Sequence, residues 1–433
     1  MTKESIRGEV KIAQKEVDKI KAKTSHVLAF RKAIEKSFKK ELTEILKIIL
    51  VGSVNLGASD LHFEPEKEKI KMRLRIDGIL HDIVFLTPEL HQKLVSRIKL
   101  LSGIKLNVTD LAQDGRLTIF LADLPIEARV ATLPSEYGES VVMRLLNPKD
   151  LIELEELGIR DELLSVFKEE IQKPNGMIIA TGPTGSGKTT TLYAILKRIQ
   201  APEIKIITIE DPIEYHLKGV AQTQVDTDKG YDFANGLEAI VRQDPDVILV
   251  GEIRDSQTAK IATQAALTGH LVLTTLHTND AAGTVARLQA LKESPVNIAP
   301  AINLAIGQRL VRRLCLRCSK MTKASEQELA LFKKELSGLR RKIKMPFFKQ
   351  GLKIPKAKGC KFCNLTGYRG RIGVYEFFLN DSEMENFILK SPSISDLRKF
   401  AQEKGMVTMK QEGLIKVLGG ITTLEEVKRV CGK

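Results

Sequence analysis

Eight consecutive residues in the middle of the chain, Gly182 to Thr189, have the types and spacing that bind phosphate groups. They match the pattern G-x-x-x-x-G-K-[ST], follow the apolar run GMIIAT and open a helical segment. In such a loop the glycines let backbone N–H groups face phosphates, the lysine neutralises phosphate charge, and the hydroxyl binds magnesium. We predict an ATP site with Thr189 as the Mg²⁺ ligand, made of Gly182, Pro183, Thr184, Gly185, Ser186, Gly187, Lys188, Thr189 and Thr190.

Acidic residues follow two apolar runs that we interpret as parallel strands. Glu210 and Asp211 follow IKIITI, and Glu252 follows VILVG. Ligands of parallel α/β sheets bind at the carboxyl ends of strands, so these carboxylates should lie near magnesium and the attacking water. We predict a catalytic set of Glu252, Glu210 and Lys188, with Glu252 as the first choice for polarising water. For Asp211, which precedes a proline, a helix N-cap is an equal alternative.

The residue after the apolar run VILV differs from the one usually found after such a strand in P-loop proteins. Gly251 stands where such strands commonly offer an aspartate to magnesium. Farther along, the run HLVLTTL begins at His270 and is followed by His277. We expect His277 to lie on the nucleotide side and to sense the γ-phosphate, and His270 to pack at the far end. Asp255 should cap the helical segment SQTAKIATQAALT.

Two pairs of cysteines have the spacing of a metal site. Cys315-x-x-Cys318 and Cys360-x-x-Cys363 are separated by 41 residues, and glycines around the second pair allow tight turns. In a cytoplasmic protein this spacing favours Zn²⁺ held by four thiolates over disulfides. Four unrelated reduced cysteines are the alternative. Cys431 has no partner in the pattern, and we expect it to pack.

Composition and charge restrict the partners. The net charge is +14, tryptophan is absent and aromatic residues are 5% of the chain, so an aromatic stacking surface for nucleic acid is unexpected. The basic excess lies in residues 1–47 and 309–371. Each segment is either a solvated surface or a surface that faces an acidic partner, such as anionic lipid or an acidic protein.

The elements that position these residues change character along the chain. We predict an α/β protein with five parts. These are a basic helical segment, a small α+β domain, a P-loop domain whose apolar strands are covered by helices on both faces, a four-cysteine zinc element and a helical C-terminal region. The corresponding boundaries are 1–47, 48–150, 151–310, 311–372 and 373–433.

Ordered motifs from about residue 58 to residue 430 resemble those of a known family. They include RLRIDG, QDGR, GPTGSGKTTTLYA, ITIEDPIEY, RQDPDVILVGEIRD, TGHLVLTTLHTND, GCKFCNLTGYRGRIGVYE and GMVTMKQEGLIKVLGGITTLEEV. Together they resemble the hexameric ATPases that power type II secretion and type IV pilus assembly. Four cysteines resemble the assembly or secretion branch more than the retraction branch.

The resemblance implies a RecA-like ATPase domain, a six-membered ring, and work on an inner-membrane platform protein. It also implies that arginines of the small N-terminal domain reach the nucleotide. The candidates are Arg116, Arg129 and Arg144, for which a surface strand position is the alternative. Departures from the family pattern include Glu238 in place of arginine, Gln257 in place of glutamate, and the absence of the usual arginine and proline before QDGR.

The sequence also indicates location. It contains no run of about 20 apolar residues and no apolar core near its start, so we expect a cytoplasmic protein. Peripheral contact with the inner membrane stays open. Two other functions stay open as well: a P-loop motor acting on nucleic acid in DNA uptake or transfer, and a nucleotide-binding switch with little turnover, which Gly251 motivates.

Overall fold

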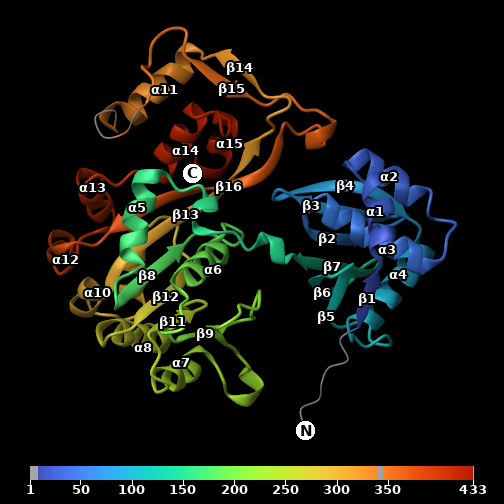
Figure 1. Cartoon of the computed structure of the whole chain (residues 1–433), viewed down its shortest axis with the longest axis horizontal. Helices are drawn as coiled ribbons and strands as arrows, with labels where there is room; N and C mark the ends of the chain where they lie inside the picture. The colour runs from blue at the N-terminus through green and yellow to red at the C-terminus, as the bar shows by residue number, and fades with distance from the viewer. Residues whose placement is uncertain (1–7, 340–342, 344, 433) are drawn as a thin grey trace. The chain divides into compact units, whose positions relative to one another are not determined.

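A computed structural model describes residues 8–339, 343 and 345–432 (Figure 1). It divides into two compact units. The N-terminal unit comprises the chain up to Asp150 together with Cys315–Ser319 and Ala357–Gly370. The P-loop unit comprises Leu151–Leu314, Lys320–Lys356 and Arg371–Lys433. Within the described residues, every helix is too short or too polar to cross a membrane.

The N-terminal unit is built on a seven-stranded sheet. All its strand pairs are antiparallel except that of the first strand with its neighbour. Buried and partly exposed residues alternate strictly along β3, as expected for a sheet with one face on a core. In spatial order the strands are β1 (Glu9–Ile12), β5 (Gln113–Leu121), β6 (Leu124–Ser135), β7 (Gly138–Leu146), β2 (Ala58–Pro65), β3 (Ile70–Ile76) and β4 (Ile79–Leu86).

Helices α1 (Gln14–Lys23), α2 (Val27–Glu35), α3 (Leu42–Asn55) and α4 (Pro88–Leu101) complete the N-terminal unit. The structure differs here from the predicted basic helical segment 1–47. In the described part of that segment, β1 pairs in parallel with β5, and α3 runs across the predicted boundary. Phe30 of α2 is fully buried in the same core as the sheet. The apolar residues between the lysines of this segment are therefore part of the core of the α+β domain.

The P-loop unit has a second seven-stranded sheet. Every residue of β8 and β12 is buried, which is typical of parallel strands covered on both faces. In spatial order the strands are β10 (Ala221–Gln224), β9 (Ile206–Glu210), β11 (Val247–Val250), β12 (Leu271–Leu276), β8 (Gly176–Thr181), β13 (Ile302–Leu314) and β16 (Tyr368–Leu379). The predicted α/β architecture of this unit is confirmed.

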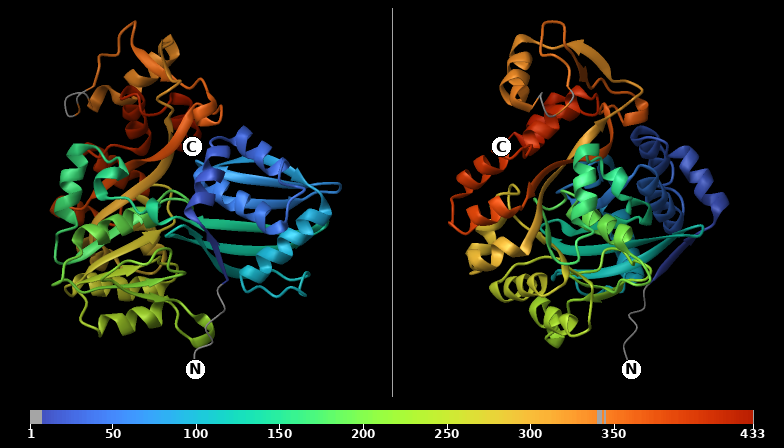
Figure 2. Two further views of the ribbon diagram at one scale, coloured as in Figure 1. Left: turned by 45° about the vertical axis from the view of Figure 1, so that its right-hand side comes forward. Right: turned by 60° about the vertical axis from the view of Figure 1, so that its left-hand side comes forward.

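Helices lie on both faces of this sheet, over two separate apolar cores (Figures 1 and 2). One core contains residues of α5 (Asp161–Glu170) and α6 (Lys188–Ile199). The other contains residues of α7 (Phe233–Val241), α8 (Ser256–Leu267), α9 (Gly283–Ala290) and α10 (Pro295–Ala301). Because the sheet is held from both sides, its strand ends are rigid positions for polar side chains.

The predicted helical region 373–433 begins inside β16, which ends at Leu379. Beyond that strand the chain is helical, as predicted, with α12 (Ser382–Ile388), α13 (Ile394–Glu403), α14 (Met409–Leu418) and α15 (Leu424–Cys431). The predicted element 311–372, by contrast, is divided. The cysteine-bearing pieces belong to the N-terminal unit. The stretch between them, with β14 (Lys320–Lys323), α11 (Glu326–Leu336) and β15 (Lys353–Lys356), belongs to the P-loop unit. The basic triplet Arg340, Arg341 and Lys342 lies outside the described residues.

Candidate functional site

The P-loop joins the end of β8 to the start of α6, and its glycines are required by its shape. Gly182, Gly185 and Gly187 have φ angles of 151°, 77° and 92°. A Cβ on Gly182 would lie 2.5 Å from the Gln308 carbonyl oxygen, and one on Gly187 would lie 2.8 Å from the Gln308 Nε2. Around Gly185 no atom lies within 4 Å of that position. The loop is thus packed on one side and open on the other, which fits phosphate groups.

Lys188 is the first residue of α6, and its ammonium folds back over the loop. Its Nζ donates to the Gly182 carbonyl at 2.9 Å. Burial lowers the pKa of Lys188, the nearby Glu252 carboxylate raises it, and Arg309 lowers it. The neighbouring Thr189 side chain is exposed. An ammonium held within the loop beside an accessible hydroxyl fits the phosphates and magnesium of a nucleotide.

Glu252 lies just beyond the end of β11, and its carboxylate is only 14% exposed. One oxygen pairs with Arg254, and the other lies 3.4 Å from the His277 Nε2. Its charge also acts on Lys188. The structure therefore brings together Lys188, Glu252 and His277, from the ends of β8, β11 and β12. We call these three residues the strand-end cluster; their roles stay predictions.

Glu210 has a different environment at the end of β9. It is 4% exposed. One oxygen accepts hydrogen bonds from the Thr208 hydroxyl at 2.7 Å and the Gln222 amide at 3.1 Å, and the other accepts from the Tyr193 hydroxyl. Burial, and then the charge of Glu210, raise the pKa of Tyr193. With both oxygens engaged, Glu210 ties β9, β10 and α6 together, and the geometry favours Glu252 as the base.

The predicted roles of Asp255 and His270 are confirmed. Asp255 caps α8, since its carboxylate accepts from the Thr258 backbone N–H at 2.8 Å and from the Thr258 hydroxyl at 2.9 Å. His270 lies at the opposite end of β12 from His277, with its Nδ1 3.0 Å from the Ala265 carbonyl. Neither residue belongs to the strand-end cluster.

The three predicted arginines form one row across the N-terminal sheet. Arg116 on β5 stands opposite Arg129 on β6, which stands opposite Arg144 on β7. Directly opposed residues share a face of the sheet. The row continues to Asp60 on β2, whose carboxylate binds the Arg144 Nε at 3.0 Å and the Arg75 Nε at 3.3 Å. The arginines therefore share one face of the sheet, and contact with phosphate stays a prediction.

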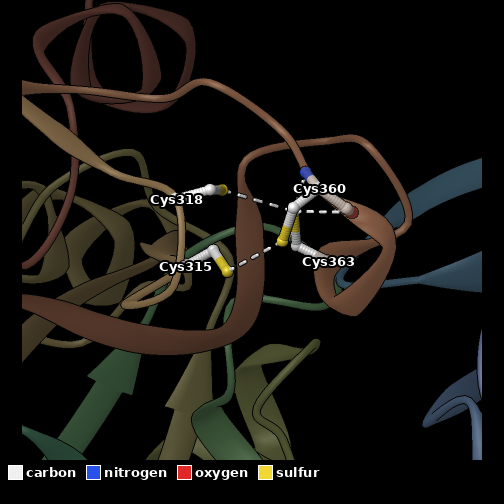
Figure 3. Close-up of side chains that lie close together, drawn as sticks. All are labelled: Cys315, Cys318, Cys360 and Cys363. Carbon is white, nitrogen blue, oxygen red and sulfur yellow. Dashed lines mark hydrogen bonds between the residues drawn. The ribbon is translucent and has the colours of Figure 1, made fainter.

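The four cysteines converge, as Figure 3 shows. Their Sγ atoms all lie within 4.8 Å of one another. The separations are 3.9 Å for Cys315–Cys360, 3.7 Å for Cys318–Cys363 and 3.7 Å for Cys360–Cys363. A tetrahedron with Zn–S bonds of about 2.3 Å has edges of about 3.8 Å. The donor set and its spacing fit Zn²⁺ bound by four thiolates.

Backbone groups and arginines surround this cysteine cluster. The Cys363 sulfur accepts from the Cys360 backbone N–H at 3.1 Å and from the Gly367 N–H at 3.2 Å. Burial opposes ionisation of Cys360, but N–H and S–H donors lower its pKa to about 7. The guanidinium groups of Arg317 and Arg369 both lie over the Phe362 ring, with Cζ atoms 3.8 and 3.9 Å from its centroid. Their charges suit the roughly −2 charge of a four-thiolate zinc site.

Cys431 lies apart from this cluster. It is partly buried and packs against the C-terminal apolar core, as predicted. Burial raises the pKa of its thiol to about 11. It provides a control thiol for experiments on the other four.

Comparison with known proteins assigns the chain to a protein family. The family described as "Type II/IV secretion system protein" matches residues 35–429. The chain belongs to this family. The resemblance inferred from the ordered motifs is thereby confirmed.

Relatives within the Type II/IV secretion system protein family include pilus and secretion proteins. The "Type IV pilus assembly ATPase PilB" of Thermus thermophilus is 44% identical over 374 residues, covering 86% of this chain and 41% of that protein. The "Type II secretion system protein E" of Dickeya dadantii is 42% identical over 390 residues, covering 90% of this chain and 75% of that protein. The chain thus spans less than half the length of the first relative.

Solved structures of a pilus motor and of an ATPase have the same fold. The pilus retraction motor PilT with bound ADP is 27% identical with a TM-score of 0.58, covering 88% of this chain and 95% of that one. The Legionella pneumophila ATPase DotB is 22% identical with a TM-score of 0.64, covering 89% and 94%. These matches confirm the predicted ATPase fold.

Three residues near the site were missed by the sequence analysis: Arg254, Gln308 and Arg309. Arg309 donates to the Asn279 carbonyl at 2.9 Å, and its charge lowers the pKa of Lys188. Gln308 and Arg309 lie on β13, which pairs with β8. The apolar run AINLAIG before them is a signal of a buried strand. Only the pairing shows that the middle of this strand passes beside the P-loop.

Proposed function

We propose that this chain hydrolyses ATP with Mg²⁺ and works as a cytoplasmic ring motor that powers type II secretion or type IV pilus assembly. The observation that carries the proposal is the strand-end cluster. Lys188 at the start of α6 meets Glu252 and His277, which follow β11 and β12, beside a loop whose open side fits phosphates. A phosphate-binding loop alone would suit a switch, whereas an adjacent carboxylate suits hydrolysis.

The residues of this chain have separate tasks in that reaction. Backbone N–H groups of the P-loop and the Lys188 ammonium hold the phosphates, and the Thr189 hydroxyl holds magnesium, which supplies charge neutralisation when bound. Glu252 accepts a hydrogen bond from the attacking water and polarises it. Arg254 and His277 fix the direction of that carboxylate through its two oxygens.

Assembly and partners follow from the family relationship. We propose a hexamer in which the row of Arg116, Arg129 and Arg144 supplies guanidinium groups to phosphate. We further propose that the ring acts on an inner-membrane platform protein, with peripheral contact to that membrane. The cysteine cluster holds one structural Zn²⁺ in each chain, because its sulfur spacing suits a closed tetrahedral site.

Phosphate release by the purified chain tests the enzymatic proposal. Wild type should release phosphate from ATP in the presence of Mg²⁺, and Lys188→Ala should lose at least about a hundredfold in rate, since it removes a charge that faces the phosphates. Lys197→Ala is the matched control, because Lys197 lies on the same helix and pairs with Glu153. Wild-type turnover in Lys188→Ala would contradict the assignment of the P-loop.

A further inference from the structure

Gln308 is a buried polar side chain that the proposed reaction does not use. It lies on β13 directly after Gly307, which pairs with Thr181 at the start of the P-loop. The side chain is 1% exposed. Its amide is engaged at both ends: Nε2 donates to the Ser186 carbonyl at 2.9 Å, and Oε1 accepts from the Thr191 hydroxyl at 2.9 Å.

The direction of this amide is set by its partners. The Ser186 carbonyl oxygen can only accept, so the NH₂ group of Gln308 must face it. The carbonyl end of Gln308 is then left for Thr191, whose hydroxyl can donate. One side chain thus holds the chain on both sides of Lys188, within the loop and in the first turn of α6.

The peptide bond between Ser186 and Gly187 is the part of the loop that Gln308 controls. A trans peptide is planar, with its C=O and N–H pointing in opposite directions. Fixing the Ser186 carbonyl on Gln308 therefore turns the Gly187 N–H away from Gln308. The loop is open at Gly185, where no atom lies within 4 Å of the position of a Cβ.

The packing around Gln308 is specific to this arrangement. A Cβ at Gly187 would lie 2.8 Å from the Gln308 Nε2, and one at Gly182 would lie 2.5 Å from the Gln308 backbone oxygen. The loop therefore fits against Gln308 only because both positions are glycine. A rearranged loop would lose two buried hydrogen bonds as well as this fit.

We propose that Gln308 is a positioning residue for nucleotide binding, which holds the Ser186–Gly187 peptide so that the Gly187 N–H faces the phosphates. The proposal rests on the proposed function as an ATPase and adds a residue outside the phosphate-binding motif. It acts on the nucleotide through the loop and makes no contact with the attacking water. The effect of its loss should therefore appear in binding and KM more than in kcat.

Nucleotide affinity and steady-state kinetics of Gln308→Met test the proposal. Methionine keeps the length of the side chain and removes both hydrogen bonds. With a fluorescent ATP analogue and Mg²⁺, we expect Kd to rise about tenfold, KM for ATP to rise in parallel, and kcat to change by less than about threefold. Thr191→Val keeps the bond to Ser186 and frees only the other end, so we expect a rise in Kd of about threefold.

Asn303→Leu is the control for loss of a hydrogen-bonded amide elsewhere on the same strand. Asn303 lies on the same strand and donates to the Asn175 carbonyl at 2.8 Å, at the start of β13 and away from the P-loop. Its Kd should equal that of wild type. Wild-type Kd and KM in folded Gln308→Met, or an equal rise in Asn303→Leu, would overturn the proposal.

A variant that does not fold and a wild type that does not bind ATP lead to different conclusions. If Gln308→Met does not fold, Thr191→Val carries the test, and an unchanged Kd in that variant overturns the proposal. If wild type itself neither binds nor hydrolyses ATP, the proposed function fails instead. The two failures are therefore distinct.

Discussion

The strand-end cluster of the P-loop unit and the cysteine cluster of the N-terminal unit both join residues far apart in sequence, but they are held differently. Lys188, Glu252 and His277 follow strands buried on both faces, and hydrogen bonds and ion pairs of the protein itself fix them. The cysteines lie on two short loops, which meet through thiol contacts, one backbone hydrogen bond from Cys315 to Gly367 and the contact of Arg317 with Phe362. The first site should persist without ligand, whereas the second should depend on its metal.

Loss of zinc is the largest effect that this comparison predicts. Cys315→Ser removes one of four ligands, and purified protein should fall from about one zinc ion per chain to nearly none. The three cysteines of the cluster that remain should then react freely with a thiol reagent. Metal analysis and thiol titration measure both effects, with Cys431→Ser as the control that keeps its zinc, because Cys431 lies outside the cluster.

The same variant also separates the two sites. Cys315→Ser should lose hydrogen-exchange protection in residues 315–319 and 357–370, since metal binding contributes local folding energy. Its affinity for ATP should stay within about twofold of wild type, as expected for sites without shared partners. Retained zinc with the three remaining cluster thiols protected, or a P-loop that loses protection equally, would show that the comparison is wrong.

A smaller effect is expected on the pH dependence of stability, from an ion pair within the P-loop unit. The Glu426 carboxylate on α15 accepts hydrogen bonds from Arg312 on β13, from its side chain at 2.8 Å and from its backbone N–H at 3.0 Å. Burial opposes its ionisation, but Arg429 and Arg312 lower its pKa to about 2. A depressed carboxyl pKa stabilises the folded state above the unfolded pKa of about 4.3, and the stabilisation is lost as the pH falls toward 2.

Glu426→Gln should therefore be less stable than wild type near pH 7, by up to about 3 kcal/mol. The difference should shrink as the pH falls below about 4. Urea unfolding at several pH values measures it, with Glu403→Gln as the control because Glu403 is exposed. A difference that is constant with pH would mean that the carboxylate charge is not the stabilising feature.

Features that depend on residues close together in sequence could be predicted, whereas features that depend on distant segments mostly could not. The P-loop, the acids after strands and the paired cysteines are local patterns, and each chemical group has a fixed place relative to its neighbours in the chain. For the four cysteines, one long-range contact had to be inferred, namely that the two distant pairs meet. The preference of zinc for four thiolates supported that inference. The α/β class needed only the change from alternating to continuous apolar runs.

The features that were missed depend on pairing between distant strands. No local pattern shows that β1 pairs with β5, so the lysine-rich start was interpreted as a separate helix. The same limit applies to Gln308, which is placed by the pairing of β13 with β8. It also applies to Arg75, which joins the arginine row only through Asp60. Local propensity specifies elements, and burial of their faces specifies neighbours.

In the proposed reaction Glu252, and not Glu210, polarises the attacking water. Phosphate release by Glu252→Gln and Glu210→Gln, with ATP affinity measured on the same samples, distinguishes the two carboxylates. Glu252→Gln should bind ATP with nearly wild-type affinity and lose about 10² to 10⁴ in kcat, because an amide does not act as a base. Glu210→Gln should retain most of its turnover and lose stability, since its carboxylate accepts three buried hydrogen bonds. The reverse result, with turnover lost in Glu210→Gln and retained in Glu252→Gln, would contradict the account.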